Sequence, residues 1–161
     1  EYGSSEAELI VAEPYALKTY HHRWYLLGRL TDGDMRIISL DRVNKVTQTK
    51  ERFLIDEDFD AKEYFSEYYA VRLDRDVKLQ RVVLRAHRNE RFIFDKQPIH
   101  WTQNKIREED TYADFEYYLR PTFDFVSYLE SQGRYVEVIS PTWLREELLR
   151  VHREAMEQNK M

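Results

Sequence analysis

The sequence contains no cysteine, and this absence alone excludes several kinds of site. Without cysteine there is no disulfide framework and no zinc site built from thiolates. A chain without disulfides fits the reducing cytoplasm, which is the location that we expect. Glycine and proline are also scarce, with four of each in 161 residues. Long flexible linkers are therefore not expected.

Long hydrophobic runs are missing as well. No apolar stretch approaches the roughly 20 residues that a membrane-spanning helix needs, so we expect no membrane association. Residues 1–8 are polar and acidic, which is unlike a signal peptide. The chain begins at glutamate rather than methionine, and this favours a fragment of a longer protein.

Metal and catalytic motifs are also lacking. His21 and His22 are adjacent, so in a strand they would face opposite sides, and the other three histidines have no partner at ligand spacing. There is no glycine-rich phosphate loop and no G-x-S-x-G motif. The acidic run at residues 56–58 is interpreted as solvated loop charge. We expect no metal, no cofactor and no enzymatic activity.

Charge is unevenly distributed along the chain. The net charge is −5, which opposes general binding to nucleic acid. Residues 15–52 nevertheless hold eight Lys/Arg against four Asp/Glu. A basic segment in an acidic protein indicates a local anion site. The alternative, a solvated basic strand face, stays open.

The first part of the chain has the pattern of short antiparallel strands. Asp32-Gly33 is a strong hairpin signal between two of them. On the strand before it, Trp24, Leu26 and Leu30 share one face, which we expect to pack in the core. A helix with a capping box at Asp60 should follow the strands. The expected strands are 15–20, 24–30, 36–40, 43–49 and 52–55.

The second part has a different order of elements. Strands are expected at 78–87, 99–106, 112–120 and 135–139, and helices at 89–95 and 122–132. The order β-α-β-β-α-β is that of the ferredoxin-like split unit. Ser140 should cap a final helix with an apolar stripe through Leu144, Leu148, Val151 and Ala155. We expect a β-rich α+β chain with domains at 1–73 and 74–161.

Several motifs together resemble WYL domains and the extension that often follows them. The WYL pieces are Pro14-Tyr15-Ala16-Leu17, Arg23-Trp24-Tyr25-Leu26 and the stretch from Arg36 to Val43, and the extension pieces are 98–103 and 141–147. The resemblance implies a small Sm-like (SH3-like) antiparallel β-barrel, then a ferredoxin-like αβ unit. It also implies a bacterial transcriptional regulator, usually a dimer. Its duplex-DNA contacts would come from an N-terminal helix-turn-helix that this sequence lacks.

The resemblance further implies a basic pocket for a nucleic acid or nucleotide. Arginine suits phosphate because its planar fork binds two oxygens, and tyrosine offers a stacking face. Arg29 and Arg36 flank the hairpin turn, and we expect them to converge across it. The predicted ligand-binding residues are Tyr15, Tyr25, Arg29, Arg36, Ser39 and Arg42.

Other interpretations of these residues stay open. Asp41 and Arg42 could form a structural ion pair at the corner after the third strand. Arg36 could be an ordinary surface residue. His100 could donate toward the ligand or a partner subunit. For the whole chain, the alternative to ligand sensing is a structural dimerisation module.

Overall fold

The chain folds into two compact units, one ending at residue 61 and the other starting at residue 62. The computed structural model describes residues 7–160. Most of residues 1–8, whose sequence is unlike a signal peptide, therefore lie outside the described residues. In that described part, no helix is long and apolar enough to cross a membrane. The domain division expected after residue 73 stays a prediction.

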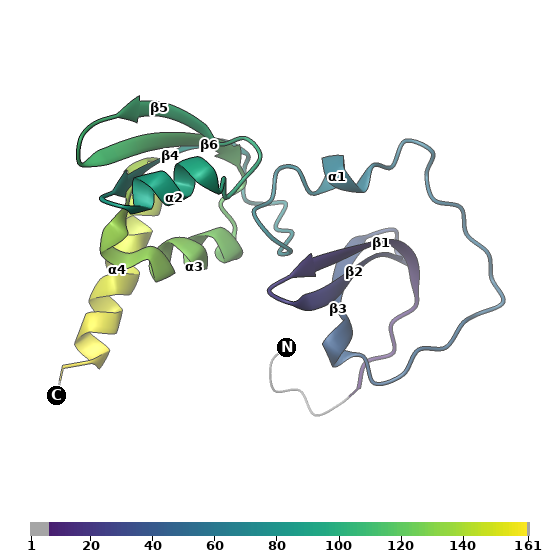
Figure 1. Ribbon diagram of the computed structural model, residues 1–161. Coiled ribbons are helices and arrows are strands. Elements are labelled where there is room, and N and C mark those ends of the chain that lie inside the picture. The colour runs from purple at the N-terminus through teal and green to yellow at the C-terminus, as the bar shows by residue number, and fades with distance from the viewer. Residues whose placement is uncertain (1–6, 161) are drawn as a thin grey trace. The chain divides into compact units, whose positions relative to one another are not determined.

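The first unit is built on an antiparallel sheet in the order β1-β2-β3 (Figure 1). Its strands are β1 (Ala12–Tyr20), β2 (Arg23–Leu30) and β3 (Met35–Ser39), and the short 3-10 helix η1 (Leu40–Arg42) follows. The predicted turn is confirmed. Gly33 adopts a φ of 91°, and the Leu30 amide donates to the Asp34 carbonyl at 2.8 Å.

The strands predicted at 43–49 and 52–55 are wrong, because this segment contains no strand. Val43 and Val46 are three residues apart, so they would point to opposite faces of a strand and give neither face an apolar stripe. Val46 and Leu54 are 84% and 87% exposed. The chain instead makes a wide irregular loop before the next helix (Figure 1). Closure of the sheet into an Sm-like barrel stays a prediction.

The expected burial of Trp24 is also wrong. Trp24 is 54% exposed, whereas Leu27 on the other face of β2 is fully buried. Aromatic side chains from beyond the sheet pack on the Leu27 face, where Phe59 meets the ring of Tyr15 edge-on at 4.9 Å. The face of the sheet with Tyr25, Leu27 and Arg29 is therefore the packed one.

The helix expected after Asp60 is only one turn long, α1 (Ala61–Tyr64). Apolar residues at helical spacing continue to Tyr68 in the sequence, but the helix does not, because the backbone at Tyr68 pairs with a distant part of the chain instead. Tyr68 forms a parallel bridge with Arg120, whose amide donates to the Glu67 carbonyl at 2.7 Å. Tyr69 packs against Phe125. Residues 62–73 thus belong to the second compact unit.

The second unit has the predicted ferredoxin-like order. Its sheet runs β5-β6-β4-β7, and all three pairings are antiparallel. Gly133 follows the second helix of this unit with a positive φ of 51°, a backbone conformation that favours glycine. The elements are β4 (Gln80–His87), α2 (Glu90–Lys96), β5 (Asn104–Glu108), β6 (Tyr112–Leu119), α3 (Phe123–Gln132), η2 (Gly133–Tyr135) and β7 (Val136–Ser140).

One face of this sheet carries the core. Alternate residues of β4, Val82, Leu84 and Ala86, are fully buried, as their period-two spacing predicts. They pack with Phe94 of α2 and Phe125 of α3 in one cluster. The helices therefore cover this face, whereas the other carries charged side chains such as Arg81 and Arg85, with Val83 buried between them.

The last helix is α4 (Thr142–Gln158). The cap predicted at Ser140 is wrong: Pro141 holds the cap position, with no side-chain hydrogen bond. Leu144 and Leu148 of the predicted stripe are buried in the core cluster, so the first half of the stripe packs on this chain. The C-terminal half of α4 extends past the sheet (Figure 1).

Two buried tyrosines predict a loss of stability in alkali. Burial raises the pKa of Tyr117 well above its usual range and the pKa of Tyr128 to about 12. In the unfolded chain both ionise near pH ~10, so the unfolded state loses its protons first. Their contribution is complete below about pH 10 and declines as pH rises toward about 12.

We therefore expect the urea midpoint to fall steeply above about pH 10. Tyr117→Phe should flatten this fall, since it removes an ionising hydroxyl. Tyr118→Phe is the matched control, because Tyr118 is 50% exposed on the same strand. Equal slopes for both variants would contradict the assignment.

Candidate ligand-binding site

Arg29 is the centre of the charged groups on the packed face of the first sheet. Its Nε donates to Glu13 at 2.7 Å, and Glu13 is its cross-strand partner on β1. Its Nη1 reaches both carboxylate oxygens of Asp56 at 3.1 Å. Its guanidinium lies 4.9 Å from the centre of the Tyr15 ring. Two carboxylates and an aromatic face thus hold one cation.

Tyr15 lies at an irregularity of β1, where the pairing with β2 shifts between Pro14 and Ala16. The side chain is only 9% exposed and packs against Phe53 and Phe59. Burial raises the pKa of Tyr15, and the nearby Asp56 adds to this while Arg29 opposes it. In the described part of the chain, no atom meets hydrogen-bond geometry with its hydroxyl.

Tyr25 and Ser39 are cross-strand partners on the same face as Arg29. The Ser39 hydroxyl donates a hydrogen bond to Asp41. Asp41 also pairs with Arg23 at 3.3 Å. The hydrogen bond from Ser39 lowers the pKa of Asp41, and the charges of Arg23 and Arg42 act in the same direction. The corner is therefore a charged cluster that includes Arg23 as well as the expected Asp41 and Arg42.

The convergence expected of Arg29 and Arg36 does not occur. Arg36 pairs with Gly28, whereas Arg29 pairs with Met35. Neighbouring positions of a strand face opposite sides, so the two arginines leave the sheet on different faces. Arg36 is exposed and contacts Glu8 at 3.4 Å. The six predicted residues thus divide into Tyr15, Tyr25, Arg29 and Ser39 on the packed face, Arg36 on the other face, and Arg42 in η1.

The prediction from sequence missed two residues of this site, Glu13 and Asp56. Glu13 directly precedes the Pro14-Tyr15 motif and could have been placed opposite Arg29 once the register was known. Asp56 belongs to the acidic run interpreted as solvated loop charge. Its own side chain is 65% exposed, so that interpretation was natural, yet it contacts Arg29.

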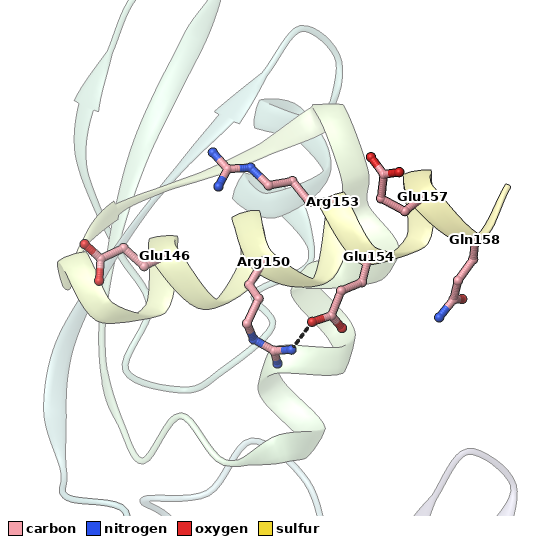
Figure 2. Close-up of a pocket in the computed structure, with 6 residues that line it drawn as sticks. All are labelled: Glu146, Arg150, Arg153, Glu154, Glu157 and Gln158. Carbon is pink, nitrogen blue, oxygen red and sulfur yellow. Dashed lines mark hydrogen bonds and ion pairs between the residues drawn. The ribbon is translucent and has the colours of Figure 1, made fainter. Parts of the chain in front are cut away.

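A second group of charges lies along α4. Figure 2 shows that Glu146, Arg150, Arg153, Glu154, Glu157 and Gln158 all project from this single helix. Arg150 donates to Glu147 and Glu154, each at 2.6 Å. These neighbours at helical spacing satisfy one another in solvent. The group is therefore a charged helix face and a poorer candidate site than the first sheet.

His100 lies in the loop between α2 and β5. Its Nδ1 is 2.8 Å from the hydroxyl of Thr102, which in turn accepts from the Tyr118 amide at 3.0 Å. These contacts fix the loop on the end of β6. Between residues 7 and 160, no three His, Asp or Glu side chains gather as a metal site would require. A role for His100 toward a ligand or partner stays a prediction.

Fold and site together define a class: an α+β protein that joins a small charged sheet to a ferredoxin-like unit. Residues 71–156 match the WCX domain, and residues 1–48 match the WYL domain. The chain therefore belongs to the WCX-domain family and begins with a WYL domain, as the motifs predicted.

One solved structure with similarity to the chain is the proteasome accessory factor B/C (PafBC) of Arthrobacter aurescens. The two are 21% identical, with a TM-score of 0.36. The similarity covers 86% of this chain but only 21% of PafBC, so the chain spans about a fifth of that protein. A comparison with curated proteins found no match.

Proposed function

We propose that this chain is the ligand-sensing regulatory region of a bacterial transcription factor, whose WYL domain binds a nucleic acid or nucleotide. The observation that carries the proposal is the position of Arg29 over the Tyr15 ring, on the face that also holds Tyr25 and Ser39. This group lies within the segment that matches the WYL domain. Such a regulator would act in the cytoplasm, which the cysteine-free sequence fits.

The chemistry of these side chains suits a phosphate-bearing ligand. A guanidinium donates to phosphate oxygens in a planar fork, and the strength of such bonds comes from the charge on both partners. Tyr25 is partly buried and can offer both a ring and a hydroxyl. The excess of positive charge over residues 15–52 would attract an anion to this part of the molecule.

Arg36 and Arg42 have a different part in the proposal. Arg36 is on the opposite face from Arg29, so the two cannot grip one compact anion. We assign the pocket to Tyr15, Tyr25, Arg29 and Ser39. Arg36 and Arg42 would contact phosphates further along an extended strand, or add to the local positive potential.

The test is binding of fluorescein-labelled single-stranded DNA and RNA, followed by anisotropy at low salt. Arg29→Ala should weaken binding by about tenfold or more, since it removes charge-assisted hydrogen bonds. Affinity should also fall as salt rises. Lys45→Ala is the matched control, because it removes an exposed charge from the same basic segment, and it should change affinity by less than about twofold.

Two results would contradict the proposal. One is no binding of any oligonucleotide or nucleotide at low salt. The other is an equal effect of Arg29→Ala and Lys45→Ala, which would reduce the interaction to diffuse attraction.

A dimerisation module is the second candidate. It is favoured by the apolar side chains that remain exposed around α3 and α4, where Phe123 is 61% and Trp143 is 42% exposed. These two residues line a shallow groove with Val126 and Val151. Light scattering tests it, since a monomer at high concentration would exclude a second copy of the chain in this groove.

A further inference from the structure

Arg29 is held by two carboxylates of different character. Glu13 is its register partner on β1, so the sheet itself sets that contact. Asp56 comes from the irregular segment 43–60, where the described backbone forms no strand. Its side chain is 65% exposed, compared with 38% for Glu13. The contact with Asp56 is therefore the one that a ligand could replace without disturbing the sheet.

The Tyr15 hydroxyl marks the same place. It is buried, and no described atom meets hydrogen-bond geometry with it. Asp56 lies beside this hydroxyl, and both its charge and a hydrogen-bond interaction of its side chain raise the pKa of Tyr15. A phosphate oxygen near the Asp56 carboxylate could accept from both Tyr15 and Arg29.

The segment around Asp56 is negatively charged, as a phosphate-bearing ligand would be. Residues 56–60 include four acidic side chains, whereas residues 15–52 carry an excess of Lys/Arg. Phe53 and Phe59 attach the segment to the Tyr15 ring on either side of Asp56. The segment thus places the Asp56 carboxylate on Arg29. Arg29 is the predicted ligand contact among the arginines on the packed face.

We propose that Asp56 is an internal competitor for the anionic ligand: its carboxylate occupies the phosphate position at Arg29 and Tyr15, and ligand binding displaces this carboxylate and loosens the segment around it. This inference rests on the proposed function. It adds where the phosphate binds and what must move when it does.

The experiment compares Asp56→Asn with Asp58→Asn in the full chain. Both variants remove one negative charge from the same segment, and Asp58 is exposed and has no described contact with Arg29. The probe is the labelled single-stranded oligonucleotide used for Arg29→Ala. Asp56→Asn should tighten binding by about three- to tenfold, because the site no longer has to be vacated. Asp58→Asn should change it by less than about twofold.

Limited trypsin digestion gives a second readout that does not depend on the ligand. Lys50 and Arg52 lie in the segment just before Asp56. In the free protein, Asp56→Asn should speed cleavage after these residues relative to Asp58→Asn. In the wild type, saturating oligonucleotide should speed the same cleavage.

The outcomes separate the two proposals. If Arg29→Ala weakens binding but Asp56→Asn binds and is cleaved like Asp58→Asn, the competitor is overturned and the proposed function stands. If neither the wild type nor Asp56→Asn binds any oligonucleotide, both are overturned.

Discussion

Replacing Phe125 by alanine should lower the free energy of unfolding of the second unit by about 4 kcal/mol. Phe125 of α3 is fully buried. Its ring meets Tyr69 edge-on at 5.5 Å and Tyr117 of β6 at 6.5 Å. Truncation therefore removes contacts that join α3, the sheet and segment 62–73, and it leaves a cavity where these three parts meet.

Urea unfolding followed by tryptophan fluorescence can measure this loss. Trp101 and Trp143 report on the second unit, whereas Trp24 lies in the first. A Trp24→Phe background leaves the signal to the second unit, and Trp24 is exposed enough to be replaced. Phe123→Ala is the matched control on the same helix. Because Phe123 is 61% exposed, it should cost less than about 1 kcal/mol. Similar losses for both variants would contradict the packing described for α3.

The second unit was largely predictable because its local signals agree with its packing. Val82, Leu84 and Ala86 alternate in the sequence and are all buried on one face of β4. Gly133 ends α3 where a positive φ is needed. Most elements were recognisable from their own residues, and their order then determined the topology. The exception is β5, which was expected at residues 99–106 but runs from Asn104 to Glu108.

The first unit was less predictable because its packing comes from outside the sheet. Trp24 is larger than Leu27, and size favoured it as the core residue. Which face is buried depends on Phe53 and Phe59, and these lie in a segment without a regular pattern. Nothing in the β2 sequence alone reveals where those rings pack.

The candidate site could not be predicted in full either, because it depends on the pairing register of the β2–β3 hairpin. Arg29 and Arg36 flank the Asp32-Gly33 turn, but whether they share a face depends on a single residue of register. The pairing of Gly28 with Arg36 puts them on opposite faces. The types of residue that bind phosphate were predictable, whereas the carboxylate of Asp56 at Arg29 required the path of segment 43–60.

The second large effect on stability is expected from an ion pair on the face of the second sheet that the helices do not cover. Arg85 of β4 donates to both carboxylate oxygens of Asp114 on β6, at 2.7 and 3.0 Å. The Asp114 side chain is only 8% exposed. Arg85 also lies 3.9 Å from the centre of the Tyr112 ring. The hydrogen bonds to Asp114 raise the pKa of Arg85 further above its usual range, so its guanidinium stays charged at any working pH.

Arg85→Leu should therefore lower the free energy of unfolding by about 3 kcal/mol, because it leaves the Asp114 carboxylate buried without its partner. The same urea experiment in the Trp24→Phe background measures it. Arg81→Leu is the control on the same strand: its partner Glu116 is more exposed, and Arg81 itself is 47% exposed, so its loss should be clearly smaller.

The double variant Arg85→Leu with Asp114→Leu separates the two causes of the loss. If the cost of Arg85→Leu comes from a stranded carboxylate, removing that carboxylate as well should restore most of the stability, to within about 1 kcal/mol of the parent. If the double variant is no more stable than Arg85→Leu alone, the loss comes instead from the contacts of the arginine with Tyr112 and its neighbours. The buried ion pair would then contribute little to the stability of this sheet.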